Sequence, residues 1–205
     1  MAQADGATPA KKPVVPWFAA MAASLLGIAV GLEYGDIDDP LLSRALLALP
    51  ILFLVKAGLN AAHNVGRLGP RGRASRAYLV RMLIVSVAYV GAVFAASALI
   101  DEGDPVTPLS IAIAIVPGLA IAGYFYAMGR FLVEQQDEFM RMLMVRQTLV
   151  ATAVAFSAAS IYGFLENFGQ VPHLDAYWWP ITFFFGLGLG ALVNKLTFGT
   201  YGEGC

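Results

Sequence analysis

Residues 130–147 read RFLVEQQDEFMRMLMVRQ, and this charged run separates two long apolar stretches. Asp137 lies four residues before Arg141 and Glu138 lies three before it, spacings at which both carboxylates reach one guanidinium on a helix. The pattern predicts a helix that continues out of the preceding apolar stretch and offers its outer side as a surface for a partner. The candidate partner-surface residues are Glu134, Asp137, Glu138, Arg141 and Arg146.

Composition places this charged run in a membrane protein. The 205 residues are 59% hydrophobic and 13% charged, whereas soluble domains carry about 25% charged residues. The mean hydropathy is +0.69. A net charge of −1 provides no basic field that would recruit nucleic acid. The single cysteine, Cys205, excludes an intrachain disulfide and a metal site built from cysteines.

Six apolar segments approach the roughly 20 residues that a membrane-spanning helix needs. They are residues 14–32, 41–62, 77–100, 108–133, 148–168 and 177–198. Pro50 and Pro117 lie inside two of them and predict kinks. The expected fold is all-α: a polytopic membrane bundle of six transmembrane helices in three sequential hairpins. Residues 1–13 are expected to form a disordered cytoplasmic tail, and residues 199–205 a short cytoplasmic tail.

Basic residues collect in alternate connections between these segments. They are Lys11, Lys12, Arg67, Arg71, Arg73, Arg76, Arg130, Arg141, Arg146 and Lys195. The other connections hold Arg44 as their one basic residue and collect acids: Glu33, Asp36, Asp38, Asp39, Asp101, Glu102, Asp104, Glu166 and Asp175. Because Lys and Arg favour the cytoplasmic side, the bias predicts that both termini are cytoplasmic.

A polar stripe marks the second segment. Lys56, Asn60 and Asn64 recur every four residues, and His63 is adjacent. Ionisable groups inside a span indicate a functional site, here a cytoplasm-facing binding or ion site. The other interpretation is a snorkelling lysine with hydrogen bonds between helices. No metal site is expected, because the second histidine, His173, falls on the opposite side of the membrane.

Three further features predict packing and surface contacts. Gly186 and Gly190 form a G-x-x-x-G face that allows close approach of two helices. Glu166 and His173 lie near the outer interface, where a pair between them would be sensitive to pH. The basic stretch 67–76, RLGPRGRASR, has no aromatic residue to stack on RNA bases, so contact with lipid headgroups is expected instead.

The part of the chain from about residue 124 to 195 resembles a family of small bacterial multi-pass inner-membrane proteins. The resemblance rests on DEFMRMLMVR at 137–146, on the G-F-L-E motif at 163–166, and on the Pro-His and Trp-Pro pairs at 172–173 and 179–180. It implies a bacterial inner-membrane protein and no particular chemistry.

Two hypotheses of function follow. The first is a non-enzymatic accessory or assembly subunit, because the sequence has no constellation of catalytic residues and predicts no cofactor. Its expected partners are the lipid bilayer and another membrane protein or a second copy of the chain. The alternative is a small transporter or channel that uses the stripe of Lys56, Asn60 and Asn64, which must then face a hydrated cavity.

Overall fold

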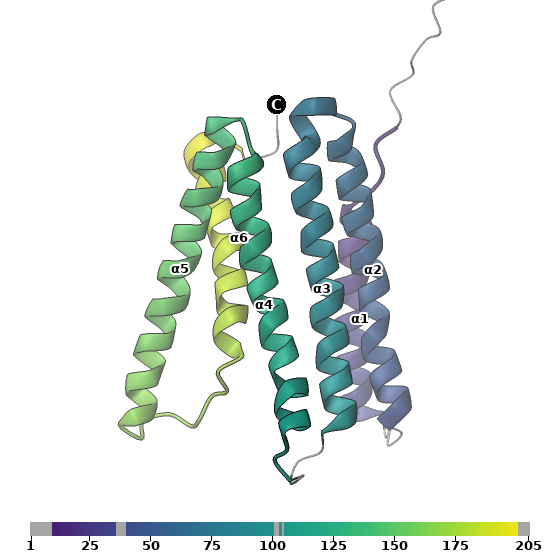
Figure 1. The fold of residues 1–205 in the computed structure, drawn as a ribbon, viewed down its shortest axis with the longest axis vertical. Coiled ribbons are helices and arrows are strands. Elements are labelled where there is room, and N and C mark those ends of the chain that lie inside the picture. Colours follow the sequence, from purple (N-terminus) through teal and green to yellow (C-terminus); the bar gives the residue numbers. More distant parts are fainter. Residues whose placement is uncertain (1–9, 36–39, 101–102, 104, 201–205) are drawn as a thin grey trace, which may run out of the picture. The chain divides into compact units, whose positions relative to one another are not determined.

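The computed structural model describes residues 10–35, 40–100, 103 and 105–200, and most of these residues are helical, with no strand among them (Figure 1). The elements are α1 (Val15–Tyr34), α2 (Pro40–Gly66), the 3-10 turn η1 (Gly69–Gly72), α3 (Arg73–Leu99), α4 (Pro108–Glu134), α5 (Glu138–Asn167) and α6 (Trp178–Phe198). All six α-helices are long and apolar enough to cross a membrane. The predicted all-α, six-helix class is therefore confirmed.

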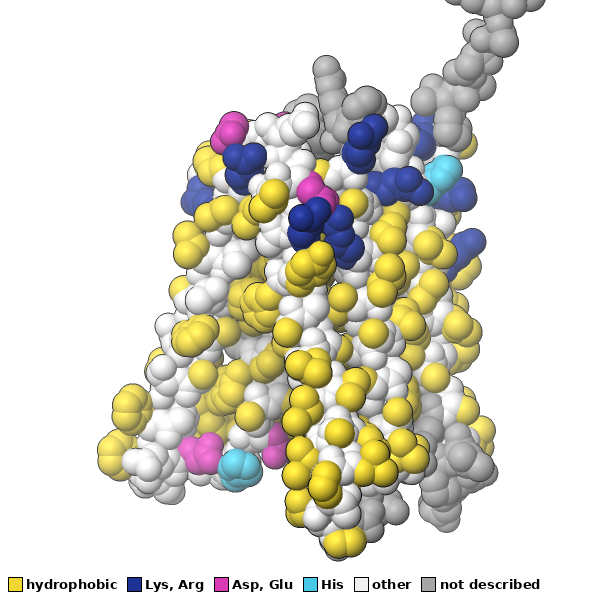
Figure 2. Space-filling model, viewed as in Figure 1, with side chains coloured by type: hydrophobic (Ala, Val, Ile, Leu, Met, Phe, Trp, Pro, Cys, Tyr) yellow, Lys and Arg dark blue, Asp and Glu magenta, His cyan; other side chains and the backbone are white. Residues whose placement is uncertain are grey.

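Large apolar side chains cover the outer sides of these helices. Leu26, Phe156 and Leu196 are among the most exposed of them, and Figure 2 shows hydrophobic side chains along the length of the helices. Contiguous exposed apolar surface on this scale marks contact with membrane or protein. Together with the helix lengths, it supports a multi-pass membrane protein.

Several helices run beyond the apolar segments that predicted them. α2 extends to Gly66, α3 begins at Arg73 and α5 begins at Glu138. At 1.5 Å per residue the 30 residues of α5 are about 45 Å long, compared with a hydrocarbon core of about 30 Å. Polarity shows where the membrane ends, but a helix can continue into water. The basic connection after α2 is correspondingly short.

The chain divides into two units, residues 1–131 and 132–205. In the first unit α2 packs antiparallel to both α1 and α3. Gly58 of α2 lies against Leu83, since a Cβ at this glycine would stand 3.1 Å from the Leu83 Cδ1. Pro50 and Pro117, the two predicted kink sites, lie inside continuous helices α2 and α4.

α3 and α4 are joined by long side chains. The Tyr124 hydroxyl donates to Ser86 Oγ at 2.9 Å, and the rings of Tyr78 and Phe131 lie 5.1 Å apart between centroids. α4 starts at Pro108, directly after Thr107. The Ser110 N–H donates to Thr107 Oγ1 at 3.0 Å, and Ser110 Oγ accepts from the Thr107 N–H at 2.9 Å. This reciprocal cap satisfies N–H groups that a helix start otherwise leaves without partners.

In the second unit α5 and α6 form an antiparallel pair with one continuous seam. Gly186 lies against Ala151 and Gly190 against Gln147. One turn further, the side-chain N–H of the fully buried Asn194 donates to the Leu143 carbonyl at 3.0 Å. The two glycines assigned to helix packing thus face α5, where the absence of a side chain lets the backbones approach closely.

Candidate functional site

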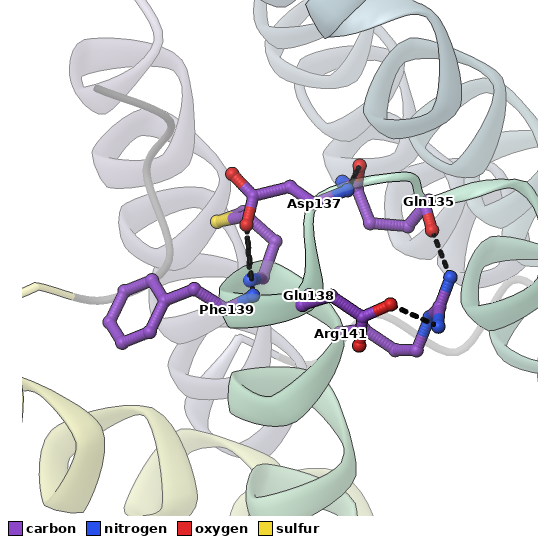
Figure 3. Close-up of polar contacts among 6 residues, drawn as sticks. Gln135, Asp137, Glu138, Phe139 and Arg141 are labelled. Carbon is purple, nitrogen blue, oxygen red and sulfur yellow. Dashed lines mark hydrogen bonds and ion pairs between the residues drawn. The ribbon is translucent and has the colours of Figure 1, made fainter.

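The connection between α4 and α5 is a helix break followed by a helix start. α4 ends at Glu134 and α5 begins at Glu138, so the single helix expected over 130–147 is wrong. Asp137 causes the new start: its Oδ1 accepts from the Phe139 N–H at 2.9 Å and from the Met140 N–H at 3.2 Å (Figure 3). The expected convergence of Asp137 on Arg141 is also corrected, because this carboxylate caps α5.

Arg141 ties the break to the first turn of α5. Its Nη1 donates to Glu138 Oε1 at 3.0 Å and its Nη2 to the Gln135 carbonyl at 2.6 Å (Figure 3). The predicted pair of Glu138 and Arg141 therefore forms. Gln135 is buried, whereas the Glu138 side chain is 83% exposed. The arginine is held by a backbone carbonyl, and the carboxylate beside it still faces outward.

A groove of about 400 Å³ runs along the start of α5. It is lined by Glu138, Arg141, Met142, Val145, Arg146 and Leu149. These positions lie three or four residues apart and so share one side of the helix. Charged side chains at positions 138, 141 and 146 are interspersed with apolar ones at 142, 145 and 149. Such a surface suits an amphipathic segment of another protein.

Arg146 is fixed by the end of α6. Its Nη2 donates to Thr197 Oγ1 at 3.3 Å, and its guanidinium lies 5.0 Å from the centroid of the Phe198 ring. The Phe139 ring meets the same Phe198 edge-on at 5.7 Å. Glu134, the remaining predicted surface residue, is half-buried at the last position of α4.

The polar stripe of α2 holds the segment that precedes α1. Asn60 Nδ2 donates to the Pro13 carbonyl at 2.6 Å. Asn64 exchanges two hydrogen bonds with the Lys12 backbone, both of 2.8 Å. The Lys56 ammonium lies 5.9 Å from the centroid of the Trp17 ring. His63 is half-buried beside the stripe in the last turn of α2.

These contacts change two expectations. Lys12 and Pro13 are fixed on α2, so the disordered tail expected over 1–13 is wrong for its last residues; residues 1–9 lie outside the described part of the chain. The transport hypothesis required the stripe to face a hydrated cavity. Both asparagine amides are instead bound to the chain's own backbone, and Asn60 is buried. The stripe therefore binds the backbone of the segment that precedes α1.

At the other end of α5 the predicted pair of Glu166 and His173 forms. His173 Nδ1 lies 2.7 Å from Glu166 Oε1. The hydrogen bond to Glu166 and its negative charge raise the pKa of His173 above its ordinary value of 6.5, and Asp175 adds a smaller effect in the same direction. The Tyr162 hydroxyl donates to the Pro172 carbonyl at 2.9 Å and anchors the same turn.

No family model, curated protein or solved structure matches the chain. The site is therefore interpreted from its own geometry. Among the described residues no three His, Cys, Asp or Glu side chains gather in a way that could hold a metal ion. What the geometry offers is two grooves lined by arginines, one at the start of α5 and one beside the turn between α2 and α3.

Two features were missed from the sequence. The start of α5 had a usable signal, because an Asp followed by an acidic first helical residue is typical of a helix N-terminus. The docking of Lys12 and Pro13 had a weaker one. Prolines at positions 13 and 16 have no N–H to donate to a helical hydrogen bond, so the stretch before α1 does not extend this helix. Its backbone is then available to the side-chain amides of α2.

Proposed function

We propose that this chain is a non-enzymatic accessory or assembly subunit of the bacterial inner membrane, with both termini in the cytoplasm. The α4–α5 connection presents its charged surface to a partner protein. The resemblance of residues 124–195 to small bacterial inner-membrane proteins supports the location. The distribution of Lys and Arg along the sequence supports the orientation.

One observation carries the proposal: the groove at the start of α5 combines charges with an apolar floor. Met142 and Val145 are each exposed by about two fifths, and Glu138 is almost fully exposed. Lipid alone would favour apolar side chains here, and water alone would favour polar ones. An amphipathic helix of another membrane protein satisfies both, with apolar side chains on the floor and a basic group against Glu138.

Site-specific photocrosslinking in cells tests this assignment. A photoreactive amino acid replaces Met142 in one variant and Phe156 in the control. Both lie on α5 at positions 14 residues apart, which is close to four helical turns and therefore nearly the same side. Phe156 is strongly exposed and lies deeper in the apolar part of the helix.

We expect a discrete protein adduct from position 142 and none from position 156. The adduct should disappear when Glu138→Lys is added, because the substitution opposes a basic partner group. The absence of a protein adduct at 142, the same adducts at both positions, or an adduct that survives Glu138→Lys would each refute the proposed role.

A further inference from the structure

A second groove, of about 460 Å³, lies beside the turn between α2 and α3. Its lining comes from two glycines of the turn region and from one face of α3: Gly66, Gly69, Arg73, Arg76, Ala77, Val80 and Arg81. The α3 residues follow the spacing i, i+3, i+4, i+7, i+8, so they form a single stripe. Figure 2 shows Lys and Arg side chains gathered at this end of α2 and α3.

The charge of this lining has one sign. Among the residues that the structure describes, three guanidinium groups and no carboxylate line the groove. Arg73 and Arg76 are exposed, and Arg81 is half-buried. Guanidinium groups present paired N–H donors that match the oxygens of phosphate. An anion that binds beside these arginines is therefore stabilised by their positive charge.

The backbone adds to this preference. α3 begins at Arg73, and Gly72 at its N-cap contributes no side-chain acceptor. The first N–H groups of this 27-residue helix therefore add positive potential at the same end of the groove.

Glycine shapes the floor of the groove. A Cβ at Gly66 would stand 3.0 Å from Arg76 Cδ and 3.4 Å from its Nε, so the arginine lies directly across this glycine. Gly69 has a φ of +63°, a left-handed conformation that favours glycine. The turn thus brings the end of α2 close to α3 and lays the Arg76 side chain over it.

Apolar side chains also line the groove. Arg73 lies at the first position of α3, and Arg81 follows eight residues later, about 12 Å along the helix axis. Ala77 and Val80 form the wall between them. A ligand that matches both kinds of lining has a phosphate for the arginines and a hydrocarbon chain for the apolar wall.

We propose that this groove binds an anionic phospholipid, with its phosphate held by Arg73 and Arg76 and the start of an acyl chain against Ala77 and Val80. The site is independent of the partner surface at α5. Basic pockets between transmembrane helices at a membrane surface are suited to such headgroups.

Native mass spectrometry of the purified full chain tests the proposal, with dioleoyl phosphatidylglycerol as probe and dioleoyl phosphatidylcholine as comparison. The test variant combines Arg73→Gln and Arg76→Gln. The control combines Lys11→Gln and Lys12→Gln, which removes the same two charges from exposed positions near the same end of α2. Lys12 binds Asn64 through its backbone, so this contact is kept.

We expect phosphatidylglycerol to bind the arginine variant about tenfold more weakly than the original chain, and the lysine variant within about twofold of it. If the double arginine variant is not monodisperse, Arg73→Gln alone carries the test, with a loss of about threefold.

Three results would overturn the site. One is equal binding of phosphatidylglycerol to the arginine variant and the original chain. Another is equal binding of the two lipids by the original chain. The third is displacement of phosphatidylglycerol by millimolar inorganic phosphate, which would make the ligand a free anion rather than a lipid.

Discussion

Asp137 and Glu166 are carboxylates at opposite ends of α5, and they have different roles. Asp137 accepts two backbone N–H groups and starts the helix. Glu166 binds the imidazole of His173 in the turn that follows α5. Histidine is the side chain whose ordinary pKa lies near neutral pH. The contact of His173 with Glu166, in the turn after α5, is thus expected to change with pH in that range.

The His173 contact should weaken as pH rises. Glu166 raises the pKa of folded His173 above 6.5, so the folded chain keeps this proton to higher pH than the unfolded chain. The stabilisation is complete below the unfolded pKa and is lost as pH rises through the folded pKa. We expect the His173 imidazole resonance to titrate above 6.5 in NMR, and closer to 6.5 after Glu166→Gln. A titration midpoint at or below that value in the original chain would contradict this contact.

At the scale of helices, the α5–α6 pair is held by residues of α6 that are spaced four apart. Gly186, Gly190 and Asn194 of α6 meet α5 on successive turns. Within lipid, close backbone packing and hydrogen bonds between helices replace the hydrophobic effect as the source of association. The glycines at this face therefore stabilise the helix pair although they have no side chain of their own.

Gly190→Ala should loosen this pair. The added Cβ would stand 2.7 Å from the Gln147 carbonyl oxygen and 2.8 Å from its Cα, so the helix backbones must separate. We expect a loss of about 1–3 kcal/mol in unfolding free energy, measured by denaturation in mixed micelles.

Gly188→Ala is the matched control for this test. It adds the same methyl group on the same helix, at a position with nothing within 4 Å. Its stability should be unchanged or slightly higher, because alanine favours helix over glycine. Equal effects of the two substitutions would contradict the seam.

The sequence predicted elements well and their contacts less well. Apolar length indicates a span because every residue in the membrane has to be compatible with lipid. The G-x-x-x-G face could be predicted from the spacing of two glycines in one segment, but its partner helix could not. The break at Asp137 was missed because charge pairing within a helix and capping of a new one use the same residue types. The docking of Lys12 on Asn64 is a contact across 52 residues, and the local pattern of prolines does not identify its partner.

At the scale of the whole molecule, the α4 helix passes from the first unit into the second. Each unit carries its own arginine-lined groove, one for the proposed lipid and one for the proposed partner. The proposed orientation, with both termini in the cytoplasm, can be addressed by one experiment.

The single cysteine, Cys205, makes this experiment direct. A maleimide that cannot cross membranes should leave the chain unlabelled in cells with an intact inner membrane, and should label it after permeabilisation. The variant Cys205→Ser with Gln170→Cys should react from outside, because exposed Gln170 lies in the turn between α5 and α6. The reverse pattern would mean the opposite orientation, and equal access to both positions would mean that a helix does not span.

The docking of the N-terminal segment has a consequence for biosynthesis. Lys12 and Pro13 leave the ribosome before the asparagines that bind them, which follow 52 and 47 residues later. While α1 is entering the membrane, these backbone groups can bind only water. They reach their final partners after most of α2 has been synthesised. The N-terminal segment therefore reaches its final contacts with the first hairpin rather than with the first helix.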